Sequence, residues 1–348
     1  MKVDVDIGDG HPARIGALAR AAETLGFDAG WVTETRREPF VAAALALAAT
    51  HRLQVGTGVA IAFARSPLVI ASAAFDLAAL SGGRFLLGLG SQVRGHVVRR
   101  FGMPWSAPAP RLGEWIGAIR AAWANWQEGA PFVFRSEHLD LSLMPDFFRP
   151  PPLEFDAPAG RPRIELAIAG VGPHMARLAG RAADGLHVHP FHTARYLDEV
   201  IEPALAAGEA ERDPTLTLRR CERLLPVFVV PSEDVAAREA VRGQVAFYAS
   251  TPAYRAVLRL HGRERAGERL SRLAATGRWA EMPALIDDEL LAEVAVVAPL
   301  AALPDALAAR VGGHAQRVMP LLPLELEPDG TPSNGRRWEG LIAALRSA

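Results

Sequence analysis

The glycine-rich corner that ends at Pro173 has the residue types of a phosphate site. It reads GVGP, and it separates an apolar run from a helix-like segment. Gly170 and Gly172 would let the backbone turn with positive φ and let a ligand approach closely, and Pro173 suits the first turn of a helix. The amides of His174 and Met175 would then lie unpaired at the positive end of the helix dipole, where phosphate binds. A tight strand-to-helix turn without a ligand is the alternative.

A second stretch, GLGSQVRGH, also follows an apolar run and carries polar groups suited to a heterocycle. Ser91 and Gln92 could hydrogen-bond the edge of a planar ring. Arg94 could meet an anion, and His96 could do so or move a proton. The alternative is a solvated loop in which Ser91 caps a helix.

The stretch WVTETRREPF places Glu34 and Thr35 at the end of an expected strand. A carboxylate in that position is a candidate for acid–base chemistry or for contact with a ring. The alternative is a surface ion pair with Arg36 or Arg37, which would contribute little to stability.

Three histidines, His187, His189 and His192, raise the question of a metal site. His187 and His189 would share one face of a strand, but no carboxylate is placed with them. Structural histidines or ring contacts are favoured, and no metal is predicted. A serine nucleophile is not indicated either, because the motif Gly-x-Ser-x-Gly is absent.

The composition is that of a protein with a large core and no bulk charge. The chain has 348 residues, 50% of them hydrophobic, and a net charge of −1, so no positive field favours nucleic acid. Cys221 is the only cysteine, which excludes an intramolecular disulfide and a cysteine metal cage. The N-terminus lacks the apolar core of a signal peptide, and the apolar stretch at residues 40–49 is too short to span a bilayer. We expect a soluble cytoplasmic protein without nucleic-acid or membrane partners.

Strand-like and helix-like segments alternate along the whole chain. Strands are expected at residues 3–7, 29–34, 53–61, 84–90, 164–170, 185–190, 222–231 and 316–323. Eight strand–helix units in this length predict an α/β fold with a parallel sheet, as a (β/α)8 TIM barrel. A doubly wound open sheet is the competitor, and the absence of Gly-x-Gly-x-x-Gly after the first strand weakens it.

Two insertions interrupt an otherwise single domain over residues 1–348. Residues 131–163 are dense in proline and predict an irregular excursion or a hairpin. Residues 233–303 form the second insertion, inside a stretch expected to be helical from residue 233 to residue 310. A further helix is expected at residues 193–210.

Taken in order, six strings resemble the bacterial luciferase-like superfamily of flavin and deazaflavin enzymes, and the resemblance covers nearly the whole chain. They are LGFDAGWVTET, VGTGVAIAFARSPLVIA, GGRFLLGLGSQ, RFGMPW, LAIAGVGPHMARLAGRAADGLHVHP and FYASTPAY. The resemblance implies a TIM barrel with an insertion region, which agrees with the alternation of strands and helices.

The resemblance also implies which residues meet the cofactor. Its phosphate would lie at the corner formed by Gly170, Val171 and Gly172. A backbone bulge behind the cofactor ring, often with a non-proline cis peptide, is implied at Gly58–Val59 or its immediate neighbour.

The end of the fourth strand completes the implied cofactor contacts with Ser91 and Gln92. One departure concerns proton handling, because many deazaflavin relatives have an acidic residue followed by histidine where this chain has Glu34 and Thr35. The role would pass to Glu34, to His96 or to a group of the substrate.

The implied activity is that of an oxidoreductase that uses the deazaflavin coenzyme F420 to transfer hydride to or from a small organic substrate. The alternative within the family is an FMN-dependent monooxygenase supplied with reduced flavin by a separate reductase. A non-catalytic ligand-binding barrel is the alternative from another class. Self-association into a homo-oligomer is left open.

Overall fold

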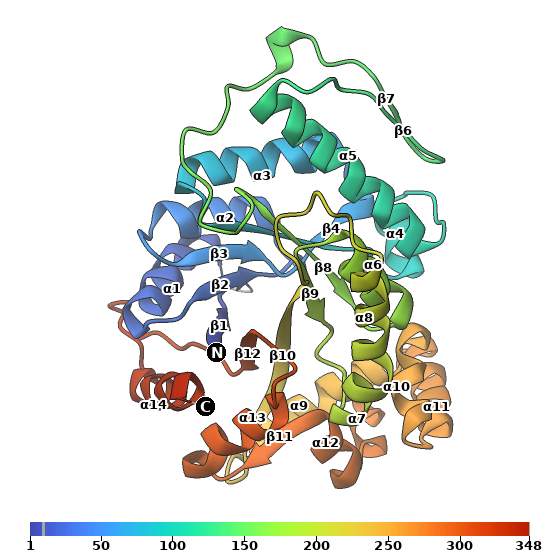
Figure 1. Ribbon diagram of the computed structural model, residues 1–348. Coiled ribbons are helices and arrows are strands. Elements are labelled where there is room, and N and C mark those ends of the chain that lie inside the picture. Colours follow the sequence, from blue (N-terminus) through green and yellow to red (C-terminus); the bar gives the residue numbers. More distant parts are fainter. Residues whose placement is uncertain (9–10, 348) are drawn as a thin grey trace.

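Eight parallel strands close into a barrel (Figure 1) in the computed structural model, which describes residues 1–8 and 11–347. Neighbouring strands follow the order β1, β2, β3, β5, β8, β9, β10 and β12, and β12 pairs with β1 to close the ring. The bounds are Lys2–Asp6 (β1), Ala29–Val32 (β2), Gln54–Thr57 (β3), Phe85–Gly90 (β5), Glu165–Gly170 (β8), Gly185–Val188 (β9), Glu222–Pro231 (β10) and Arg317–Leu321 (β12). The predicted TIM barrel is confirmed, and the open sheet is excluded.

Helices cover the outside of the barrel, and their ends follow the expected signals (Figure 1). Proline occupies the first turn of several of them, and α1 ends at Gly26, which has φ 85°. The main covering helices are α1 (Pro12–Leu25), α2 (Pro39–Ala48), α3 (Pro67–Ser81), α5 (Pro108–Glu128), α6 (Pro173–Ala182), α8 (Glu202–Ala210), α13 (Leu303–Val311) and α14 (Gly335–Ser347). Within the described residues, no helix is both long enough and apolar enough to cross a membrane.

The first insertion contains the hairpin that its sequence allowed. Strands β6 (Phe134–Arg135) and β7 (Asp140–Leu141) pair antiparallel and lie along α5. Phe134 packs so closely there that a Cβ at Gly117 would lie 2.7 Å from its ring.

Two predicted helical stretches are wrong in detail. Residues 233–310 form α9 (Val235–Ala249), α10 (Arg255–Leu260), α11 (Glu264–Ala275) and α12 (Asp288–Val294), and then an unpredicted strand β11 (Ala295–Ala298). β11 pairs with β10 beyond the barrel, because β10 is ten residues long and leaves an edge to cover. The helix predicted at 193–210 has a π-helical turn at Leu197–Ile201, since Pro203 lacks the N–H that an α-helical bond needs.

A buried ion pair joins the first strand of the barrel to the last. Arg317 on β12 donates to both carboxylate oxygens of Asp4 on β1, at 2.7 and 3.0 Å. The indole N–H of Trp31 on β2 donates to the same carboxylate at 2.9 Å. The side chain of Asp4 is 0% exposed and that of Arg317 is 5% exposed, so each charge depends on the other.

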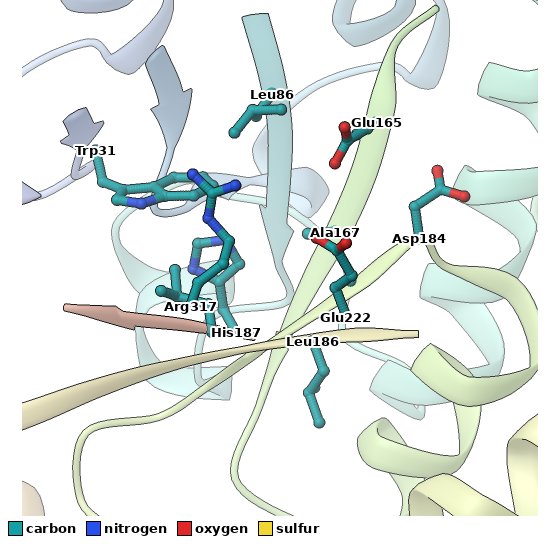
Figure 2. Close-up of a pocket in the computed structure, with 11 residues that line it drawn as sticks. Trp31, Leu86, Glu165, Ala167, Asp184, Leu186, His187, Glu222 and Arg317 are labelled. Atoms are coloured by element: carbon teal, nitrogen blue, oxygen red, sulfur yellow. The ribbon is translucent and has the colours of Figure 1, made fainter. Parts of the chain in front are cut away.

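A small cavity of about 30 Å³ lies beside this ion pair (Figure 2), with His187 and Arg317 on one side and Glu165 and Glu222 on the other. The last three of these residues begin their strands, so the cavity belongs to the N-terminal end of the barrel. Arg161 from the first insertion donates to Glu165 at 2.5 Å and to Glu222 at 2.7 Å. These ion pairs tie the insertion to this end of the barrel.

The carboxylate of Glu23 fastens α1 to the segment that enters β3. One oxygen accepts hydrogen bonds from the backbone amides of His51, Arg52 and Leu53, at 2.9, 2.5 and 2.9 Å. Partial burial raises the pKa of Glu23, but the three hydrogen bonds outweigh it, so the net pKa is lowered from its ordinary value.

Replacing Glu23 with glutamine should lower the free energy of unfolding by about 1 kcal/mol near neutral pH, because charge-assisted hydrogen bonds become neutral ones. A carboxyl group with a lowered folded-state pKa stabilises the fold above its unfolded pKa of about 4.3, and the effect is lost as the pH falls through the folded value. The difference between wild type and Glu23→Gln should therefore shrink below that pH in urea titrations. Glu128→Gln, at the exposed end of α5, is the matched control, and an equal loss there would contradict the assignment.

Candidate functional site

The residues predicted to act on a ligand all follow the carboxyl ends of barrel strands. Glu34 follows β2, Gly58 follows β3, Ser91 follows β5 and Gly172 follows β8. Because the strands of the closed barrel are parallel, these ends lie at one end of it, which is where TIM barrels carry their sites. The cavity in Figure 2 lies at the opposite end.

Glu34 is held by contacts that were not foreseen. Its Oε2 accepts from the backbone amide of Ile61 at 2.7 Å and from Arg65 at 2.8 Å, and its Oε1 accepts from Arg65 at 3.0 Å. The side chain is 7% exposed. Burial lowers the pKa of Arg65, but hydrogen bonds and charge from Glu34 and Glu38 outweigh it and raise the pKa. The carboxylate therefore fixes the chain after β3, and its ion-pair partner is Arg65 and not Arg36 or Arg37.

The segment after β3 has the backbone feature that was predicted. The peptide bond between Gly58 and Val59 is cis, and β4 (Ala60–Ile61) continues on the far side of it to pair with β5. A Cβ at Gly88 would lie 2.0 Å from the Thr57 carbonyl oxygen, and one at Gly90 would lie 2.5 Å from Val59. The glycines of β5 are needed because this segment presses against them.

The glycine corner differs from its prediction in one respect. Gly172 has φ −112°, and neither it nor Gly170 is among the residues with positive φ, so the expected positive φ is wrong. Gly170 is instead required by packing, because a Cβ there would lie 2.6 Å from the Cβ of Met175. A Cβ at Gly172 would meet no described heavy atom within 4 Å. The corner thus has an open side at Gly172.

The first amides of α6, next to Gly172, have no acceptor in the helix. The first amide of α6 with an acceptor is that of Ala176, which donates to the Gly172 carbonyl at 3.1 Å, so those of His174 and Met175 precede the helical ladder. The neighbouring carbonyl of Val171 accepts from the Tyr196 hydroxyl at 2.9 Å, which anchors the corner from behind.

The chain after β5 turns sharply at Gln92. This residue has φ 57°, and its Oε1 accepts from the Val93 amide at 2.8 Å. Ser91 Oγ donates to the Gln92 carbonyl at 3.3 Å and does not cap the short helix α4 (Arg94–Arg99) that follows. His96, on α4, is exposed.

The three histidines make structural and ring contacts, which is the interpretation that the sequence analysis favoured. His187 stands edge-on to Trp31 with ring centroids 4.3 Å apart. His192 is buried, and its Nδ1 lies 2.9 Å from the carbonyl oxygen of His189. His189 packs against Tyr248 at 4.6 Å.

Tyr248 and Tyr254 were not among the residues predicted to form the site. They lie on α9 and on the 3-10 turn Pro252–Tyr254, after β10, and both rings contact His189 at the end of β9. The two tyrosines in FYASTPAY, six positions apart beyond a strand end, were the available signal.

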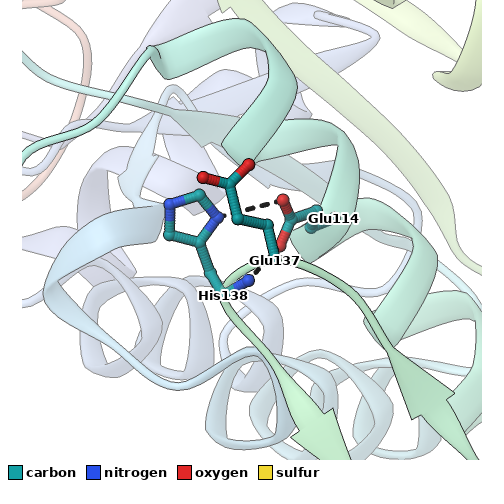
Figure 3. Close-up of side chains that lie close together, drawn as sticks. All are labelled: Glu114, Glu137 and His138. Atoms are coloured by element: carbon teal, nitrogen blue, oxygen red, sulfur yellow. Dashed lines mark hydrogen bonds and ion pairs between the residues drawn. The ribbon is translucent and has the colours of Figure 1, made fainter.

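One group of possible metal ligands occurs in the described part of the chain, away from the strand ends (Figure 3). Glu114 on α5 and Glu137 and His138 at the tip of the hairpin offer ligand atoms within 4.8 Å of one another. The Glu114 carboxylate accepts from the Ser136 hydroxyl at 2.5 Å and from the His138 amide at 3.0 Å. Through these bonds Glu114 anchors the hairpin to α5.

Sequence relatives match this chain over most of its length. The family model described as luciferase-like monooxygenase matches residues 1–317. An uncharacterised protein of Mycobacterium tuberculosis is 42% identical over 323 residues, which are 92% of this chain and 93% of the relative. A 5,10-methylenetetrahydromethanopterin reductase of Archaeoglobus fulgidus is 27% identical over 282 residues, 78% of each chain.

Solved structures share the fold. The coenzyme F420 dependent tetrahydromethanopterin reductase from Methanopyrus kandleri superposes with a TM-score of 0.77 at 18% identity, over 99% of this chain and 98% of that one. The oxygenating constituent of 3,6-diketocamphane monooxygenase from Pseudomonas putida, in complex with FMN, gives 0.61 at 17% identity, over 99% and 97%. With a matched family, a closed barrel and candidate residues at its carboxyl end, this chain is an oxidoreductase that belongs to the luciferase-like monooxygenase family.

Proposed function

We propose that this chain uses coenzyme F420 to transfer hydride to or from a small organic substrate. The observation that carries the proposal is the open side of the glycine corner, where Gly172 leaves space and the amides of His174 and Met175 have no acceptor within the helix. A helix N-terminus with such space suits a phosphate, and the cofactor has one. When bound, the cofactor supplies the hydride chemistry, and the chain supplies binding, orientation and electrostatics.

The remaining predicted contacts would hold the ring. In this proposal Gly58 and Val59 back it, and Ser91 and Gln92 contact its edge. Of the two residues predicted to carry protons, the contacts favour His96, which is exposed. Glu34 would have to leave its ion pair and its bond to the Ile61 amide to take up a proton, so we assign it the task of holding the segment that backs the ring.

F420 is preferred to FMN for two reasons. The Methanopyrus kandleri reductase is named for F420 and superposes with the higher TM-score. Exposed arginines follow β5 and line α6, where an acidic cofactor tail could run, and they are Arg94, Arg99, Arg100, Arg177 and Arg181. Two of the five are already engaged, Arg100 with the Thr35 carbonyl and Arg177 with Glu211.

An FMN-dependent monooxygenase is the second candidate, and the FMN complex of the Pseudomonas putida protein is the observation in its favour. It would need a separate reductase to supply reduced flavin. Self-association is part of the proposal in either case. It is supported by apolar side chains on α2 and α3 that are 41–58% exposed, namely Val41, Leu45 and Val69.

Retention of the cofactor by the purified protein tests the proposal. Ligand-free protein is incubated separately with F420, FMN and NADPH and then desalted, and absorbance spectra identify what stays bound. We expect F420 to be retained and NADPH to be lost. Retention of FMN but not F420 would favour the monooxygenase, and loss of all three would contradict the proposal.

Salt should weaken F420 binding more than FMN binding. The net charge of the chain is −1, so any attraction for the acidic tail comes from locally placed arginines. Raising the ionic strength from about 0.01 M to about 0.15 M shortens the Debye length from about 30 Å to about 8 Å. We expect the dissociation constant of F420 to rise over this range in fluorescence titrations. An equal rise in the dissociation constants of both cofactors would show that the arginines do not attract the acidic tail of F420.

A further inference from the structure

His189 occupies the mouth of the barrel with its ring held from two sides. It follows the last residue of β9, and its amide donates to the Gly170 carbonyl at 3.0 Å, which places it beside the glycine corner. Because His187 points into the barrel toward Trp31, His189, two residues further on, lies on the same inward side. The ring of Tyr254 lies 4.3 Å away at 41°, and that of Tyr248 lies 4.6 Å away at 86°.

The hydrogen bonding of His189 determines which of its nitrogens carries the proton. The backbone amide of Phe191 donates to Nδ1 at 3.1 Å, so Nδ1 is an acceptor. In a neutral imidazole the proton must then lie on Nε2. Within the described residues Nε2 makes no hydrogen bond, and the residue is partly exposed. Nε2–H is therefore a donor that has no acceptor among the described residues.

The groups around this donor favour a neutral ligand over an anionic one. Burial, with a smaller contribution from His192, lowers the pKa of His189 to about 3, so the ring carries no positive charge near neutral pH. Burial raises the pKa of Tyr254 to about 12 and also raises that of Tyr248. The carboxylate of Asp6, at the end of β1, adds to the rise at Tyr248. The wall thus offers neutral donors and aromatic faces.

We infer that His189 is a substrate-binding residue whose Nε2–H donates to a neutral oxygen of the substrate, with Tyr248 and Tyr254 packing on an apolar or planar group beside that oxygen. The substrate class is a neutral carbonyl compound or the corresponding alcohol, not a carboxylate or a phosphate ester. The inference rests on the proposed function only in naming this ligand as the hydride partner, because the binding itself needs no cofactor.

Two small probes test the inference without cofactor. Acetophenone is a neutral aryl ketone, and benzoate carries a charged carboxylate on the same ring. Ligand-observed NMR titrations would compare wild type with His189→Phe, which keeps the ring contacts and removes the donor, and with the exposed control His51→Phe. We expect acetophenone to bind wild type more tightly than benzoate, and His189→Phe to weaken acetophenone roughly threefold to tenfold, the effect of one neutral hydrogen bond.

The remaining outcomes separate this inference from the proposed function. Tighter binding of benzoate, or equal binding of acetophenone to wild type and His189→Phe, would overturn the inference, whereas neither result bears on F420. Nitrogen-15 NMR of labelled histidine gives a second readout, and we expect His189 to stay neutral and protonated at Nε2 from about pH 5 to about pH 8. A titration in that range, or a proton on Nδ1, would also overturn it. An unchanged far-ultraviolet circular dichroism spectrum and urea midpoint of His189→Phe would show that the fold is intact.

Discussion

Replacing Gly172 with aspartate is expected to weaken F420 binding at least tenfold, about 1.4 kcal/mol, while the fold stays intact. A side chain at this position would project into space in which a Cβ meets no described atom within 4 Å. The fold should therefore tolerate it, but the carboxylate would stand where the cofactor phosphate is proposed to lie, and like charges repel. Fluorescence titration of the variant against wild type measures the loss.

Two further variants separate charge from volume in this experiment. Gly172→Asn has almost the shape of the aspartate and no charge, so it should lose less affinity. Gly340→Asp adds the same charge at another open glycine, on α14, and should leave F420 binding unchanged. If Gly172→Asp binds F420 as tightly as wild type, the corner is only a tight turn.

Replacing Arg317 with methionine is expected to lower the free energy of unfolding by about 3–5 kcal/mol. The change removes the guanidinium that neutralises the Asp4 carboxylate, which is 0% exposed in the wild-type structure. The Trp31 N–H would remain as a hydrogen-bond donor to this carboxylate. Urea unfolding followed by circular dichroism measures the difference.

The double variant Asp4→Leu/Arg317→Met is the informative control, because it removes both charges and leaves none unpaired. It should be more stable than Arg317→Met alone. Arg278→Met is the matched surface variant, because the side chains of Arg278 and its partner Glu281 are both more than half exposed. No measurable loss of stability is expected for it. A loss for Arg317→Met no larger than that for Arg278→Met would contradict the role of the buried pair.

Much of the fold could be predicted because its signals are local. The barrel strands are apolar runs or, in β1, an alternating run, bounded mostly by glycine, proline or polar residues, and the resemblance to one family covers nearly the whole chain. Strand β11 was missed because AVVA is short and continues a stretch with helical periodicity. What makes it a strand is the free edge of β10, which lies more than 60 residues earlier in the chain.

The sequence predicted where the candidate site residues lie in the fold, but it did not predict which residues they contact. Strand ends identified Glu34 and the glycine corner, but the partner of Glu34 is Arg65, 31 residues away, and no spacing rule connects the two. Gly170 is a glycine because of the Cβ of Met175 and not because of its own φ. Tertiary contacts of this kind decide what a glycine or a carboxylate does, and a linear pattern does not contain them.

Equilibrium titration of the ligand-free protein with F420 and, separately, with FMN tests the central claim most directly. Both ligands are followed by fluorescence in one buffer at low ionic strength. The proposal predicts a dissociation constant for F420 at least tenfold below that for FMN. FMN binding as tightly as F420 would contradict it in favour of the monooxygenase, and the absence of binding by either would contradict the assignment of a deazaflavin or flavin cofactor to this chain.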